Sequence, residues 1–134
     1  MLSRALAKSS PSHGLRLLPY LFAAGAVFWL IELTEFAAVL AAPAGREQLV
    51  QTLAGAGFGR NASAMLIVES VIVVFLEASA AVLHGAAYYG LRKFRAWGWI
   101  AAMIVSAAWS LVVVGIPVLV FLLRRRTRAA YGIP

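Results

Sequence analysis

Four glutamates and one histidine lie inside long apolar stretches, where ionisable side chains are rare. Glu32 and Glu35 fall in the stretch 17–42, and Glu69, Glu77 and His84 fall in the stretch 63–91. An ionisable residue at the centre of a membrane helix costs about 3 kcal/mol on insertion scales, and it usually belongs to a functional site. Neither stretch contains Lys or Arg. A carboxylate there must therefore be protonated, bind a cation, line a wet cavity or pair with another chain.

The spacing of these five residues aligns them, and we call them the polar ladder. Glu32 and Glu35 share one helix face, and Glu77 and His84, which are two helical turns apart, share another. In a pair of antiparallel helices, Glu32 and Glu77 would lie at the same depth, near the middle of the membrane. His84 would lie about 10 Å to one side of that level, with Glu35 and Glu69 on the other side.

Three functions are compatible with the polar ladder. Protonated glutamates could hold helices or subunits together through hydrogen bonds to backbone carbonyls or to the hydroxyls of Thr34, Ser70, Ser79, Ser106 and Ser110. The glutamates and His84 could instead relay protons or cations. In the third case carboxylates and imidazole hold Mn, Fe or Zn, or His84 alone binds a haem or pigment, although the Glu-x-x-His pattern of di-iron bundles is missing.

Small residues near the end of the stretch 63–91 predict close helix packing. Ala81 and Gly85 form a small-xxx-small pair, which lets two membrane helices approach each other. The same segment carries Glu77 and His84, so we expect this polar face to pack inside the bundle or against a protein partner.

Several classes of function are not supported by the sequence. It contains no Asp, no Gly-x-Ser-x-Gly, no phosphate-binding glycine loop and no His-Glu-x-x-His, so we do not expect an enzyme. Cysteine is absent, which leaves no disulfide framework and no thiolate metal site. The net charge of +7 comes mainly from residues that flank the apolar stretches, where they meet anionic lipid headgroups, and this argues against nucleic-acid binding.

The composition predicts an all-α integral membrane protein, since 63% of the 134 residues are hydrophobic and only 13% are charged. We expect three transmembrane helices at about 17–42, 63–91 and 97–123. A short amphipathic interfacial helix is expected at about 44–54, followed by a glycine break at 55–59. Basic tails would occupy 1–16 and 124–134. The sequence Gly115-Ile116-Pro117 predicts a kink within the third helix.

The distribution of Lys and Arg bears on the orientation of these spans. With three spans, six basic residues lie on each side, and the positive-inside rule decides nothing. If the chain turned at Gly115 to Pro117 and doubled back as a fourth half-span, the split would be ten to two. Only 118–123 is apolar after that turn, so we favour three spans. The first loop is the least basic segment, which predicts a cytoplasmic N-terminus.

Two segments resemble a group of small bacterial multi-span membrane proteins of unknown function. They are 87–99 (Ala-Tyr-Tyr-Gly-Leu-Arg-Lys-Phe-Arg-Ala-Trp-Gly-Trp) and 124–132 (Arg-Arg-Arg-Thr-Arg-Ala-Ala-Tyr-Gly). In that group an Ala-Tyr-Gly-Leu turn, basic residues and a Trp join two spans, and members usually carry four spans. The resemblance covers about the last half of the chain. It implies a location in the bacterial inner membrane, but no reaction and no substrate.

Together these patterns predict a small accessory or scaffold subunit. Its spans would pack against a larger membrane protein assembly or against its own copies, in contact with membrane lipids. The prediction rests on the small-residue surface at Ala81 and Gly85 and on glutamates that have no counter-charge at their depth.

Overall fold

Every element of the chain is helical in the computed structural model, which describes residues 13–111 and 115–133. No strand occurs among these residues. The helices are α1 (His13–Ala41), α2 (Pro43–Leu53), α3 (Ala62–Arg92), α4 (Ala96–Ser110), α5 (Gly115–Leu123) and α6 (Arg125–Ala130). The all-α prediction is confirmed for this part of the chain.

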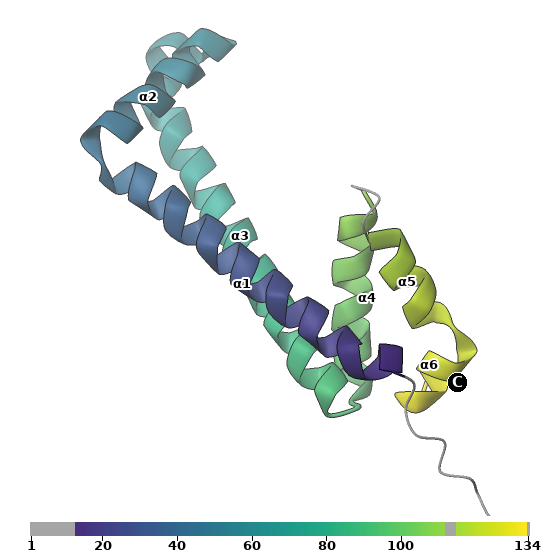
Figure 1. Cartoon of the computed structure of the whole chain (residues 1–134). Helices are drawn as coiled ribbons and strands as arrows, with labels where there is room; N and C mark the ends of the chain where they lie inside the picture. Colours follow the sequence, from purple (N-terminus) through teal and green to yellow (C-terminus); the bar gives the residue numbers. More distant parts are fainter. Residues whose placement is uncertain (1–12, 112–114, 134) are drawn as a thin grey trace, which may run out of the picture.

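Two long helices, α1 and α3, form an antiparallel pair (Figure 1). Helix α4 packs against α3, and α5 packs against α4. Two segments, Arg16–Ala41 and Pro43–Arg92, are long and apolar enough to cross a membrane, and the second contains α3. Only 17% and 11% of their most apolar windows are buried within the chain. A core helix of a soluble protein would be mostly buried, so this exposure favours lipid or another protein as the surroundings.

The connection between α1 and α3 contains the predicted short helix and the predicted glycine break. Ala42 is extended, and Pro43 then starts α2, where its missing N–H costs no hydrogen bond. After α2, the chain passes through an irregular turn in which Gly57 and Gly59 have positive φ values of 104° and 50°. Residues other than glycine rarely adopt this backbone conformation, which explains why glycines occupy these two positions. The position of α2 at a membrane surface remains a prediction.

The predicted continuous third helix over 97–123 is wrong. The chain forms two shorter helices, α4 and α5, and α5 returns antiparallel along α4 (Figure 1). The Trp99 indole N–H donates a hydrogen bond of 3.1 Å to the Leu122 carbonyl. Gly115 lies directly against the backbone of Ser106 and Ser110, where a Cβ atom would overlap it. This close approach, with Pro117 in the first turn of α5, makes a hairpin where the sequence analysis expected a kink.

The chain after α5 folds back onto the bundle, so the predicted C-terminal tail over 124–134 is largely structured. Thr127 and Tyr131 are buried, and the Tyr131 ring stacks on Phe94 of the α3–α4 turn at 5.5 Å between centroids. Burial raises the pKa of the Tyr131 phenol to about 12. At the other terminus, α1 already begins at His13, and residues 1–12 of the predicted tail lie outside the described residues.

The hairpin brings most of the positive charge to one end of the molecule, which we call the basic end. The start of α1, the α3–α4 turn and α6 all lie there (Figure 1). The basic residues at this end are Arg16, Arg92, Lys93, Arg95, Arg124, Arg125, Arg126 and Arg128. In the described part of the chain only Arg46 and Arg60 lie at the opposite end.

Candidate functional site

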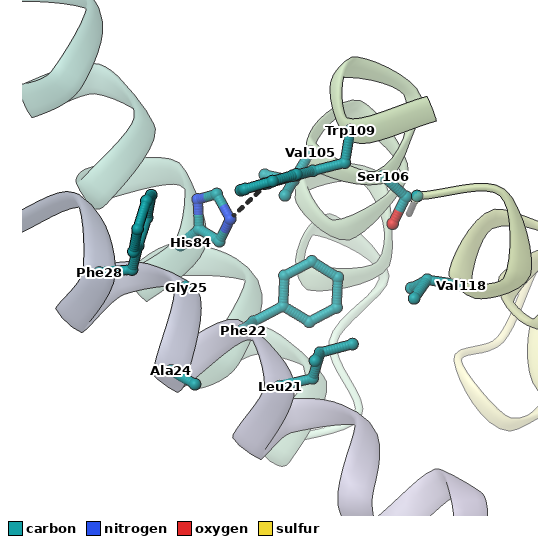
Figure 2. Close-up of a pocket in the computed structure, with 11 residues that line it drawn as sticks. Leu21, Phe22, Ala24, Gly25, Phe28, His84, Val105, Ser106, Trp109 and Val118 are labelled. Carbon is teal, nitrogen blue, oxygen red and sulfur yellow. Dashed lines mark hydrogen bonds between the residues drawn. The ribbon is translucent and has the colours of Figure 1, made fainter. Parts of the chain in front are cut away.

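His84 lies where α1, α3 and α4 meet, and both of its ring nitrogens are hydrogen-bonded. It is 5% exposed, and it packs directly against Gly25 of α1. Its Nδ1 lies 2.7 Å from the Ala80 carbonyl, and its Nε2 accepts a hydrogen bond of 3.1 Å from the indole N–H of Trp109 (Figure 2). A carbonyl can only accept, so Nδ1 carries the proton and the imidazole is neutral. Gly25 is required because a side chain there would overlap the ring.

A cavity of about 260 Å³ opens beside His84, between α1, α4 and α5 (Figure 2). Its walls are mostly apolar and aromatic, and they are formed by Leu21, Phe22, Ala24, Gly25, Phe28, His84, Val105, Ser106, Trp109, Gly115 and Val118. An apolar hollow with a few polar groups is the usual form of a small-molecule site. This cavity is the candidate functional site.

Ser106 supplies the cavity with a hydroxyl that has no partner in the described part of the chain. The side chain is buried at 2% exposure, and Ser110 bonds only the Ser106 carbonyl. A buried hydroxyl without a partner costs roughly 1–3 kcal/mol. The His84 nitrogens are already bonded, so Ser106 is the side chain on this wall that is available to a bound molecule.

Glu32 and Glu77 lie further along the α1–α3 pair, away from His84. The Gly25–His84 contact fixes the register, and both glutamates stand seven residues, about 10 Å, beyond it. Both are partly buried. The Glu77 Oε2 atom and the Trp29 indole nitrogen are both buried, and neither has a hydrogen-bond partner within the described residues.

Two of the expected hydroxyl partners of the glutamates, Thr34 and Ser70, bond elsewhere. Thr34 donates to Leu30, and Ser70 donates to Leu66, each to a carbonyl one turn back in its own helix. Glu35 and Glu69, the remaining members of the polar ladder, are exposed. The register places Glu69 about 7 Å further along the pair than Glu35, because it lies five residues beyond the level of Glu35.

The polar ladder is therefore not one cluster. In the residues that the structure describes, no three His, Asp or Glu side chains are grouped to hold a metal ion. A haem or pigment could be ligated by His84 Nε2 only after the Trp109 hydrogen bond was broken. A proton relay through His84 would face the same obstacle, since the lone pair of Nε2 is occupied.

The two residues of the predicted packing pair lie in different surroundings. Ala81 is buried at 8% exposure, but a Cβ added to Gly85 would meet nothing within 4 Å. The close contacts form instead at Gly25 and between Gly90 and Gly98, whose backbones touch where α3 turns into α4. Glycine spacing along a single helix could not identify these positions, because each contact involves a second helix.

Sequence reasoning also missed the cavity, whose lining residues come from four helices. Trp109 offered one signal, because an indole N–H in an apolar stretch needs an acceptor and His84 was a candidate acceptor.

The chain matches no protein-family model, no curated protein and no solved structure. The resemblance to small bacterial membrane proteins stays a prediction.

Proposed function

We propose that this chain is an accessory subunit of a membrane protein complex in the bacterial inner membrane. The observation that supports this is the part of the α1–α3 pair that extends beyond the tip of α4. We define the arm as residues 30–41 of α1 and 62–79 of α3. Trp109, near the end of α4, reaches only as far as Trp29 and His84, so α4 does not cover the arm.

The arm combines a broad apolar surface with exposed carboxylates. Its large exposed hydrophobic side chains are Leu30, Ile31, Val39, Ile67, Val68, Val71, Ile72, Val74, Phe75 and Leu76. Glu35 and Glu69 are exposed on the same two helices. An apolar surface alone would suit lipid, but carboxylates within it do not, and such residues usually face a protein partner or water.

The charge of the arm favours a different protein over a second copy of this chain. No Lys or Arg occurs in residues 17–45 or 61–91. A second copy would therefore add carboxylates at this depth and no counter-charge. The fitting partner is a membrane helix with a Lys, Arg or hydrogen-bond donor facing Glu35 and Glu69.

The hairpin supports an orientation in the membrane. In this proposal α1 and α3 cross the bilayer, while α4 and α5 enter from the basic end and return to it. The 15 residues of α4 extend about 22 Å, which is short of a hydrocarbon core of about 30 Å. The basic end, where α1 begins and α6 lies, then faces the cytoplasm.

Purification of the full chain from its native membrane in a mild detergent tests the proposal. We expect a second membrane protein in stoichiometric amount. Glu69→Leu should reduce its recovery severalfold, since one unpaired buried charge or donor costs a few kcal/mol. Glu47→Leu is the matched control, because Glu47 is exposed on α2 outside the arm, and recovery should not change.

Two results would contradict this function. One is a folded monomer that retains no partner under any mild detergent. The other is a homo-oligomer that persists in the Glu69→Leu variant. Proton or cation flux through liposomes that falls on Glu77→Gln would instead favour transport by the polar ladder.

A further inference from the structure

A second apolar hollow continues the cavity toward the basic end. Its volume is about 280 Å³, and it is lined by Leu17, Leu18, Leu21, Pro117, Val118 and Phe121. Leu21 and Val118 also line the cavity beside His84, so the two hollows are neighbours. Together they form a groove between α1 and α5, which we call the α1–α5 groove.

Positive charge flanks the mouth of this groove on both sides, from Arg16 of α1 and from Arg124, which follows α5. Arg16 directly precedes Leu17 on α1 and is exposed. On the other side, the guanidinium carbon of Arg124 lies 5.9 Å from the centre of the Phe121 ring, which lines the groove. Guanidinium groups bind phosphate oxygens through paired hydrogen bonds, so the mouth suits a phosphate group.

We propose that the α1–α5 groove binds one anionic phospholipid, with its phosphate between Arg16 and Arg124 and an acyl chain between α1 and α5. The inner end of the chain would enter the cavity beside Phe22 and Trp109. This inference rests on membrane insertion of the chain, but it does not depend on the partner proposed for the arm.

The headgroup decides the selectivity in this arrangement. An acyl chain gains little by leaving bilayer hydrocarbon for an apolar groove, because the two surroundings are alike. Each arginine near an anionic headgroup contributes about 1 kcal/mol, which corresponds to about fivefold in affinity. The groove should therefore prefer anionic over zwitterionic lipid of the same chains.

Native mass spectrometry of the delipidated full chain tests this directly. The probes are dioleoylphosphatidylglycerol and dioleoylphosphatidylcholine, titrated separately in the same detergent. We expect one tightly bound phosphatidylglycerol and weaker binding of phosphatidylcholine. Arg16→Gln and Arg124→Gln should each lower the phosphatidylglycerol affinity about fivefold. Arg46→Gln and Arg60→Gln, at the opposite end, are the matched controls and should leave it unchanged.

A second series tests the path of the acyl chain. Val118→Trp fills the middle of the groove and should lower phosphatidylglycerol affinity, because the acyl chain can then no longer lie between α1 and α5 while the phosphate lies between the two arginines. Leu21→Trp fills it from the opposite wall and replaces Val118→Trp if that variant loses helix content by circular dichroism.

Three results of the lipid titrations would overturn the inference. They are equal affinity for the two lipids, equal losses in the control arginine variants, and full affinity in a folded groove-filling variant. The inference would also be overturned if the purified chain released a smaller apolar molecule in stoichiometric amount and the binding of that molecule depended on Ser106. A lost subunit partner, by contrast, would leave lipid binding intact, since the arm and the groove share no residue.

Discussion

Replacement of Gly25 by alanine should separate α1 from α3 at His84. A Cβ atom at this position would overlap the imidazole ring. The ring cannot simply turn away, because it is hydrogen-bonded to Ala80 and to Trp109. Either the helices part or these two hydrogen bonds break.

The expected loss of stability in Gly25→Ala follows from three contributions to the free energy of unfolding. Forcing an extra methyl group into a packed contact costs about 1–3 kcal/mol. Hydrogen bonds between membrane helices average about 0.6 kcal/mol and reach about 1.7. Alanine in place of glycine within a helix stabilises the helix by about 0.5–1 kcal/mol, which partly offsets this loss. Gly85→Ala, on α3, gains the same helical preference without any overlap, because the space beside Gly85 is open.

The assay compares the free energies of unfolding of the two variants in mixed micelles, followed by circular dichroism. Gly25→Ala should be about 1–3 kcal/mol less stable than Gly85→Ala, and Gly85→Ala should match or exceed the unsubstituted chain. Equal stabilities of the two variants would show that α1 and α3 do not touch at His84, and would refute the packing around the cavity.

Three further predictions concern the hairpin and the basic end. Trp109→Phe removes the donor to His84 and should lower the free energy of unfolding by about 0.6–1.7 kcal/mol in the same assay. Gly98→Ala should cost about 1–3 kcal/mol, because its Cβ would overlap the backbone of Gly90, and reduced cross-linking between engineered cysteines on α3 and α4 would report the separation. Tyr131 should ionise at a pKa of about 12, because burial disfavours its phenolate, and Tyr131→Phe should remove the tyrosinate absorbance that appears near that pH. Because this phenol ionises at pH 10.0 when unfolded, the folded chain should lose up to about 3 kcal/mol as pH rises from 10 to 12.

The first three helices, α1 to α3, could be predicted from the sequence because their signals are local. Long apolar stretches gave α1 and α3, Pro43 marked the start of α2, and the glycines after Leu53 marked its end. Helix ends of this kind depend on one or two residues whose backbone preferences are strong. The sequence also indicated that the glutamates have no counter-charge at their depth, because this conclusion needs only the absence of Lys and Arg from the stretches 17–42 and 63–91.

The hairpin was the largest error, and its reason is physical. Apolar stretches in a membrane protein are assigned as crossings on length and hydropathy, and 97–123 satisfies both. The outcome depends instead on α5 packing against α4 through Gly115 and the Trp99–Leu122 hydrogen bond. One sequence signal did indicate it, since doubling back gave the asymmetric charge split that the positive-inside rule favours.

The hairpin can form only after the two long helices have been synthesised. Its contacts join residues close in sequence, such as Trp99 and Leu122, which are 23 residues apart. The Gly25–His84 contact joins residues far apart, and it can form only after α2 and the glycine turn have been made. Synthesis proceeds from the N-terminus, so α1 and α3 can pair before α5 exists. Gly115 and Val118, which are synthesised after both long helices, then complete the cavity walls.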